Sequence, residues 1–341
     1  MDQSMINTTN RNDWHIRVSL TSNCNFRCVY CNPEGIKEEA ALMSNTDIEN
    51  ILKAASTHGI SRVHWTGGEP TLRNINHFLS YAKQLGYKDQ IITTNGARGG
   101  DLVKDMKQSG LTRLIVSLDS LDPVLNKKIT GRDNLDETLD TIETGVKLFS
   151  KPTKMNIVYM ENTLSELPQF LEYAKQVNQD SNNSGKLVLK LIELCPNNPV
   201  FYDKSGKDLY SESHRNRDLL LSKLNSLSSI SPVTVEGDNP NADYFHAEDY
   251  NVDIGLVTMP SLDYRCGKEK CRKLRINPYG AAGVCISNTP ILLKDKSYDE
   301  IEFGFGNLLD LRSKLDRTNL DRRHFKAEYG FWRFGLCERN K

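Results

Sequence analysis

Three cysteines stand close together near the start of the chain, Cys24, Cys28 and Cys31, in the spacing C-x3-C-x2-C after a hydrophobic stretch. Cysteine thiolates hold iron–sulfur clusters, and a cubane cluster usually takes four of them. Three close ligands without a fourth would leave one iron open to bind a substrate or cofactor. Structural zinc is the alternative, although zinc usually takes four ligands as two C-x2–4-C pairs. The run therefore predicts an iron–sulfur cluster with an open iron.

A second group of cysteines, Cys266, Cys271 and Cys285, follows in the last third of the chain. Eight cysteines in 341 residues are too sparse for a disulfide scaffold, and six of the eight fall in the two triplets. Such grouping is more typical of metal sites than of disulfides. The second triplet therefore predicts a second metal site.

The overall charge of the chain is balanced. Lysine plus arginine and aspartate plus glutamate both number 44, so no basic excess indicates nucleic acid and no acidic tail indicates disorder. Residues 1–13 are polar and lack the apolar core of a signal peptide. No run approaches the roughly 18 apolar residues of a membrane helix. We expect no nucleic-acid or membrane partner, and a place in the reducing cytoplasm, where cluster thiolates stay unoxidised.

Short β-branched runs recur along the first half of the chain, and a helical pattern follows most of them. The expected strands are His15–Thr21, Arg62–Thr66, Gln90–Thr94, Arg113–Leu118, Lys154–Met160 and Lys186–Leu194. The expected helices are Ser44–His58, Asn74–Leu85, Asp101–Ser109, Leu135–Phe149 and Leu164–Val177. This alternation predicts a parallel sheet with right-handed crossovers. Periodicity alone leaves open whether the sheet is a partial (β/α)6 barrel or an open doubly wound sheet.

Unusual polar clusters stand where most of these strands end. They are the cysteine run, Thr66–Pro70, Thr93–Gly96, Ser117–Ser120 and Glu193–Cys195. Any one of them alone could be an ordinary strand-to-helix turn. Together they favour a TIM-like partial barrel, because active sites in such barrels are built from the carboxyl ends of the strands. The fifth strand is the exception, since its notable residue, Lys154, stands at its start.

The regular alternation of expected strands and helices ends after Cys195. Two prolines interrupt it at Pro196 and Pro199. A helix and short strands are expected next, at His214–Leu227, Pro232–Glu236, Tyr244–Glu248 and Val252–Met259. We therefore expect two domains: a partial barrel over residues 1–195, and a module over 196–341 that caps the barrel and carries the second cysteine triplet.

From about Arg17 to Ser287 the chain resembles a branch of the radical S-adenosylmethionine (SAM) enzymes, the GTP 3',8-cyclases that begin molybdenum-cofactor biosynthesis. The segments that carry the resemblance are Arg17–Thr21 with the cysteine run, Thr66–Arg73, Thr93–Gly96, Ser117–Asp122 and Ile129–Gly131. An aromatic residue before the third cysteine, here Tyr30, is also a mark of the radical SAM enzymes. The strongest discriminator is the second triplet, in which thirteen residues separate Cys271 from Cys285 and Arg275 has its expected place.

This resemblance implies SAM and two [4Fe–4S] clusters as cofactors, with one cluster on each cysteine triplet. The positions implied to contact SAM are Tyr30, Gly67, Gly68, Glu69, Ser117 and Cys195. The positions implied around the substrate are Arg17, His64, Thr93, Lys154, Lys273 and Arg275. The implied reaction is a lyase-type cyclisation. An electron from a one-electron donor cleaves SAM to a 5'-deoxyadenosyl radical, which takes hydrogen from the ribose C3' of GTP, and the substrate radical then attacks the guanine C8.

Three features depart from the family pattern. The first spacing of the second triplet is x4 where the family has x2, His64 and Lys273 stand where the family has arginines, and the chain ends at Lys341 without the Gly-Gly tail of the family. Lysine and histidine lack the planar forked donors of arginine. Another nucleotide, a nucleoside or a peptide therefore stays open as the substrate. An iron–sulfur or zinc protein that has lost SAM chemistry is a further alternative.

Two cysteines lie outside the triplets. Cys195 takes the place of a family methionine whose backbone meets SAM, and we interpret its side chain as a small buried hydrophobe. Cys337 near the end of the chain is interpreted as a free thiol, with a fourth ligand to the second cluster as the alternative.

The substrate is expected to carry negative charge. Residues 277–280 form a turn sequence with proline in second place, which predicts that Cys271 and Cys285 lie on paired strands. Lys273 and Arg275 would then share one face of a strand. With Arg17 and Lys154 approaching from the barrel, the cations would converge on one volume. Such convergence is costly unless an anion fills the volume, so we expect a small anionic, nucleotide-like substrate.

Overall fold

A computed structural model of the chain describes residues 14–31, 41–181, 185–194, 217–235, 242–257, 272–283 and 291–317. The three cysteines of the second triplet, together with Cys195 and Cys337, lie outside these residues. Within them, no helix is both long enough and apolar enough to cross a membrane.

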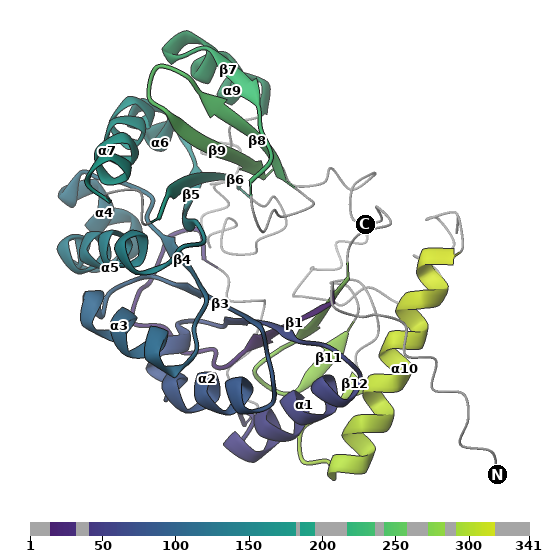
Figure 1. The fold of residues 1–341 in the computed structure, drawn as a ribbon. Helices are drawn as coiled ribbons and strands as arrows, with labels where there is room; N and C mark the ends of the chain where they lie inside the picture. The colour runs from purple at the N-terminus through teal and green to yellow at the C-terminus, as the bar shows by residue number, and fades with distance from the viewer. Residues whose placement is uncertain are drawn as a thin grey trace, which may run out of the picture.

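Six parallel strands form the centre of the sheet, side by side in chain order. They are β1 His15–Ser19, β2 Arg62–Thr66, β3 Asp89–Thr94, β4 Arg113–Ser117, β5 Thr153–Tyr159 and β6 Leu187–Glu193. The sheet curves into a partial barrel with the helices on its outer side (Figure 1). The predicted partial barrel is confirmed, and the strand bounds differ by at most two residues from those expected.

The helices between the strands cover the outer face of the barrel. They are α1 Asn45–Thr57, α2 Ile75–Gln84, α3 Gly99–Ser109, α4 Pro123–Thr130, α5 Leu135–Leu148, α6 Glu161–Ser165 and α7 Leu167–Asp180, with the short 3-10 helix η1 Pro70–Leu72. Local signals set their ends. Ser44 and Asp47 form a capping box at the start of α1. Gly110, with φ 118°, ends α3 in the left-handed conformation that glycine adopts without strain.

The single helix expected over Leu164–Val177 is wrong, because the segment divides into α6 and α7 at Glu166. The Glu166 carboxylate accepts hydrogen bonds from Ser120 Oγ at 2.8 Å and from the Leu121 amide at 2.8 Å. Pro168 opens α7, where its missing N–H would have no partner in the helix. Helix α4, which the sequence did not predict, follows β4.

Strands from the C-terminal part of the chain extend the barrel sheet at both edges. At the β6 edge lie β9 Val252–Val257, β8 Ala242–Ala247 and β7 Ile230–Pro232, and at the β1 edge lie β10 Lys273–Ile276, β11 Ala281–Gly283 and β12 Ile291–Leu292. Two further helices are α9 Arg217–Leu227 and α10 Tyr298–Arg317, and α10 packs beside α1 (Figure 1). These strands were expected in a cap over the barrel. Those that the structure describes belong to the barrel sheet itself.

The hairpin predicted around residues 277–280 is confirmed, because β10 and β11 pair antiparallel across this turn. Gly280 has φ 80°, and a Cβ there would lie 2.5 Å from Cβ of Lys294. Strand β10 also pairs in parallel with β1. The hairpin therefore places Lys273 and Arg275 beside the first strand of the barrel.

The two faces of the sheet differ in polarity. Side chains alternate along each strand, and one set packs against the helices in the main apolar core, as Ile16, Val18 and Trp65 do. The other set faces the inside of the barrel and is largely polar, including Arg17 on β1 and His64 on β2. This polar interior lies below the strand ends that carry the cysteine run.

Candidate active site

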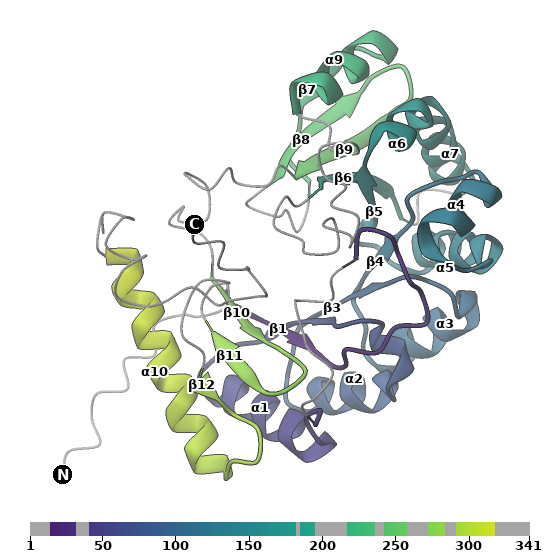
Figure 2. The same ribbon diagram turned by 180° about the vertical axis from the view of Figure 1, so that it is seen from behind.

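The segment with the first three cysteines follows β1 and is held by backbone hydrogen bonds to the end of α4. The amide of Arg27 donates to the carbonyl of Thr130 at 2.7 Å, and the amide of Val29 donates to that of Ile129 at 3.0 Å. In Figure 2 the purple segment after β1 runs beside α4. Cys24 and Cys28 are half-buried and Cys31 is exposed. Helix α4 therefore supports the cysteine run from one side.

The three thiols come from one short segment of the chain. Among the residues that the structure describes, no group of three His, Cys, Asp or Glu side chains that could hold one metal ion is found. A cubane places each cysteine on its own iron. Burial, together with the nearby Cys24 and Asp119, raises the pKa of Cys31 to about 11. A bound metal reverses this effect, because a coordinating thiol is deprotonated.

Tyr30 is fixed by a buried carboxylate at the ends of β4 and β5. Its hydroxyl donates a hydrogen bond to Asp119, whose other oxygen accepts from the amide of Val158 at 2.7 Å. Burial raises the pKa of Asp119 to about 6, which these hydrogen bonds oppose. Tyr30 packs against the small buried cluster of Ile129, Met160 and Leu194. Tyr30 thus ties the cysteine run to the strand ends.

Gly67 and Gly68 lie against the chain that leads into the cysteine run. The amide of Gly68 donates to the carbonyl of Thr21 at 2.6 Å, and that of Glu69 donates to the carbonyl of Asn23 at 2.8 Å. A Cβ at Gly68 would lie 2.2 Å from the oxygen of Asn23. Close packing alone therefore explains why glycine stands at both positions, in addition to the SAM contact that the resemblance implies.

The side chain of Glu69 connects the ends of two strands. Its carboxylate accepts from the amide and hydroxyl of Thr71 at 3.0 and 2.7 Å, from Thr94 Oγ1 at 2.8 Å and from the Asn95 amide at 2.8 Å. The residue is 1% exposed, and burial raises the pKa of its carboxyl group. Glu69 therefore joins the polar clusters after β2 and β3, and any contact of this residue with SAM stays a prediction.

The interior of the barrel brings several predicted substrate residues together. Arg17 stands between His64 on β2 and Arg275 on β10 in the strand register. Lys154 is buried on β5. Burial lowers the pKa of His64 well below its usual value, and the charges of Arg17 and Lys273 lower it further. The neutral ring of His64 lies 2.7 Å from Thr93 Oγ1. The expected convergence of cations is confirmed, and their contact with substrate stays a prediction.

Lys190 on β6 belongs to the same interior, and sequence analysis missed it. Burial, together with the charges of Lys154, Lys273 and Arg17, lowers the pKa of Lys190 to about 7. A single lysine in the apolar strand LVLKLIE gives no local sign of this position. Only the pairing of strands far apart in sequence places it among the other cations.

Comparisons with known proteins identify the family. A model of the Radical SAM superfamily matches residues 18–174. Over 285 residues the chain is 32% identical to the GTP 3',8-cyclase of Vibrio parahaemolyticus, covering 81% of this chain and 79% of the relative. Over 298 residues it is 30% identical to the GTP 3',8-cyclase of Haemophilus influenzae, covering 84% and 81%. The chain belongs to the GTP 3',8-cyclase family of radical SAM enzymes.

Solved structures agree on the fold. SuiB of Streptococcus suis bound to precursor peptide SuiA has a TM-score of 0.59 at 16% identity, with 86% of this chain and 65% of that chain covered. The chain thus spans less than two thirds of SuiB. The native anSMEcpe with bound AdoMet has a TM-score of 0.55 at 18% identity, with 84% and 79% covered. At these identities the likeness shows the fold alone.

As a GTP 3',8-cyclase family member, the chain is a radical SAM enzyme that uses SAM and iron–sulfur chemistry. Cys24, Cys28 and Cys31, which are free thiols in the structure, stay the predicted ligands of such a cluster. Ser117 ends β4 near the cysteine run and pairs with Asn156 in the strand register.

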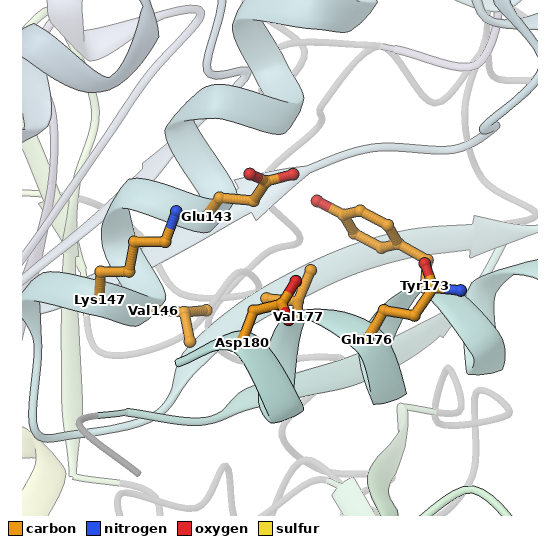
Figure 3. Close-up of a pocket in the computed structure, with 7 residues that line it drawn as sticks. All are labelled: Glu143, Val146, Lys147, Tyr173, Gln176, Val177 and Asp180. Atoms are coloured by element: carbon orange, nitrogen blue, oxygen red, sulfur yellow. The ribbon is translucent and has the colours of Figure 1, made fainter. Parts of the chain in front are cut away.

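A hollow of about 100 Å³ lies apart from this site, between α5 and α7 on the outer surface (Figure 3). The side chains of Glu143 and Tyr173 point toward each other across it (Figure 3). Burial raises the pKa of Tyr173, and the charge of Glu143 raises it further. The residues that line the hollow include none of the predicted site residues. It therefore adds nothing to the cyclase-family site.

Proposed function

We propose that this enzyme cleaves SAM reductively to a 5'-deoxyadenosyl radical, abstracts hydrogen from a purine nucleotide and so drives a cyclisation, with GTP as the first candidate substrate. The observation that carries the proposal is the layer of cations inside the barrel, formed by Arg17, Lys154, Lys190, Lys273 and Arg275. The relatives named GTP 3',8-cyclase support the same substrate.

The chemistry of the cation layer fits a polyphosphate. Arg17 and Arg275 stand side by side on β1 and β10, and guanidinium groups bind phosphate oxygens through paired hydrogen bonds. Lys190 has a lowered pKa because burial and neighbouring cations disfavour its charge. A bound phosphate group would favour the charged form of Lys190, whereas a neutral peptide would not.

The cofactors supply the radical chemistry, and the chain positions them. When bound, the cluster delivers the electron that cleaves SAM, and SAM then provides the radical. Asp119 holds the ring of Tyr30 at the mouth of the barrel. Glu69 fixes the strand ends beside the cysteine run. The cations of the interior would bind the phosphates below this mouth and leave the ribose toward the strand ends that carry the cysteine run.

The second cysteine triplet is proposed to hold a second [4Fe–4S] cluster. Cys271 and Cys285 lie outside the described residues, but they flank the β10–β11 hairpin in the sequence. The hairpin therefore supports a position beside Arg275. Anaerobically reconstituted protein should hold about eight irons, and alanine in place of Cys24, Cys28 and Cys31 should remove about half of them. About four irons plus one zinc would contradict two clusters.

The substrate is tested with GTP that carries deuterium at C3'. Reconstituted enzyme is incubated anaerobically with SAM and dithionite, and the 5'-deoxyadenosine is analysed by mass spectrometry. The proposal expects deuterium in 5'-deoxyadenosine and a cyclised nucleotide product. ATP, guanosine and a synthetic peptide serve as matched alternatives. If 5'-deoxyadenosine formed with GTP contains no deuterium and one of the alternatives is turned over, that alternative and not GTP is the substrate.

Two further parts of the proposal concern the setting of the reaction. The electron comes from a one-electron donor that the chain does not itself contain, and the reaction takes place in the reducing cytoplasm. The free cysteines Cys24, Cys28 and Cys31 support the second part, because cysteines stay reduced in the cytoplasm.

A further inference from the structure

Lys154 contacts a tyrosine that comes from the C-terminal part of the chain. Its Nζ donates a hydrogen bond to Tyr244 Oη at 3.2 Å and lies 5.2 Å from the centre of the tyrosine ring. Both residues are buried. Lys154 stands on β5 and Tyr244 on β8, and the strand order β5-β6-β9-β8 puts two strands between them. The two side chains therefore extend toward each other over β6 and β9 and meet there.

Gly255 makes this reach possible. It pairs with Tyr244 in the strand register and stands beside Lys190 on its other side. A Cβ at Gly255 would lie 2.6 Å from Cε1 of the Tyr244 ring. The absence of a side chain thus lets the ring lie flat over β9, where glycine in a strand often marks such a close approach. Val188 and Val235 pack against the ring and complete its support.

The contact restrains a flexible cation. A lysine ammonium is a point charge on a stem of four carbons, so its position depends on what surrounds it. The oxygen of Tyr244 accepts one of its protons, and the ring approaches the same ammonium as a cation–π partner. An ammonium carries three protons, so the bond to Tyr244 takes only one of them. The contact with Tyr244 thus fixes where the ammonium of Lys154 lies.

We propose that Tyr244 is a positioning residue that holds the Lys154 ammonium for the anionic substrate, and that Gly255 gives it the space to do so. The proposal deepens the proposed function, since it rests on Lys154 as a substrate contact. It also gives the β8–β9 pair a part in the active site, as one wall of the cation layer. Nothing in the local sequence around Tyr244 indicates this role.

A double-mutant cycle tests the proposal. GTP affinity is measured by equilibrium dialysis for the reconstituted parent, Tyr244→Phe, Lys154→Met and the double variant, alongside SAM cleavage without substrate. We expect Tyr244→Phe to weaken GTP binding about tenfold while substrate-free SAM cleavage is unchanged. In the double variant the loss should equal that of Lys154→Met alone, because Tyr244 acts only through the lysine. A purely structural effect would instead add to the effect of Lys154→Met.

Two further variants complete the test. Tyr159→Phe is the matched control, because Tyr159 is a fully buried tyrosine on β5 in the outer core, and its GTP affinity should equal that of the parent. Gly255→Ala should displace the ring and reproduce the Tyr244→Phe loss. Additive losses in the cycle, or parent-like affinity in Gly255→Ala, would overturn the positioning role alone. Parent-like affinity in Lys154→Met would overturn it together with the proposed phosphate site.

Discussion

At the amino-terminal ends of the strands, the cations inside the barrel are neutralised by a carboxylate, whereas one layer higher the cations face one another. In the lower layer, Asp89 accepts hydrogen bonds from Arg113 Nε at 2.8 Å, Arg62 Nε at 3.1 Å and Thr112 Oγ1 at 3.0 Å. Burial alone would raise the pKa of Asp89, but the hydrogen bond and charge of Arg113 outweigh it and lower the pKa to about 2.

The upper layer is arranged in the opposite way. Among the residues that the structure describes, the charges that act on Lys190 are those of Lys154, Lys273 and Arg17, and each of them opposes its protonation. His64 is kept neutral by burial and by the same neighbours. Both layers use basic residues on adjacent strands of one sheet. A basic residue that contacts Asp89 inside the barrel therefore has a structural role. A basic residue whose neighbours are other cations is a candidate to bind an anion.

Removing the carboxylate of the lower layer should have the largest effect. Asp89→Asn leaves Arg113 buried without its counter-charge, and breaking a buried pair in this way costs about 3–5 kcal/mol. The free energy of unfolding, measured by urea denaturation at pH 7, should fall by that amount. Asp101→Asn is the control, since the Asp101–Lys104 pair is exposed on α3 and such pairs contribute little. If Asp89→Asn lowers the free energy of unfolding no more than the control does, the lower layer does not have this structural role.

The pH dependence of the Asp89 contribution has a definite sign. Its pKa is lowered in the folded state, so its stabilisation is present above the unfolded value of 3.8 and is lost as the pH falls toward about 2. Acid denaturation curves of the parent should therefore show a loss over this range that Asp89→Asn lacks.

Cations of the upper layer should affect binding more than stability. Arg17→Ala and Arg275→Ala should each weaken GTP binding about 10- to 100-fold, as expected for a lost charge-assisted hydrogen bond. Substrate-free SAM cleavage should stay close to that of the parent. Arg98→Ala, an exposed arginine at the start of α3, provides the control. If both interior variants bind GTP as the parent does, the upper layer is not the phosphate site.

Local signals in the sequence predicted most of the fold. Ser44 and Gly110 mark helix ends through caps that act within a few residues, and the alternating strands predicted the parallel sheet. The turn at residues 277–280 predicted the β10–β11 hairpin. Helix α4 was missed because Pro123 and Gly131, which bound it, also fit a series of turns.

The two layers of the interior were harder to predict, because they depend on pairings between distant strands. Asp89 meets partners 24 and 27 residues away along the chain. Arg275 lies beside Arg17 only because β10 pairs in parallel with β1. The sequences of the strands that contain Lys190 and Tyr244 do not indicate which side chains these two residues contact. The motifs at the strand ends thus predicted the mouth of the site better than its interior.

Replacing the buried lysine should separate stability from binding. Lys190→Met removes a cation whose charge is opposed by burial and by its neighbours, so the unfolding free energy of the substrate-free protein should rise by about 1–3 kcal/mol at pH 6. In the folded protein the pKa of Lys190 is about 7, below the ordinary lysine value of 10.5 that applies to the unfolded chain. The cost of the buried charge is therefore full below pH 7 and disappears as the pH rises toward 10.5. Urea denaturation at pH 6 and 9 should show the gain shrinking, whereas GTP binding at pH 6 should weaken.

The smallest expected effect is a proton uptake when the anion binds. Phosphate beside Lys190 favours its charged form, so binding raises the pKa of this lysine above its value of about 7 in the free protein. GTP affinity should then fall as the pH rises from 7.5 to 9, by at most about tenfold per pH unit for one proton. His64 does not contribute in this range, because its pKa is already lowered well below 6.5. Lys190→Arg keeps the charge at all of these pH values, so its affinity should change less with pH than that of the parent. Equal slopes in calorimetric titrations of the two proteins would show that Lys190 does not meet the bound anion.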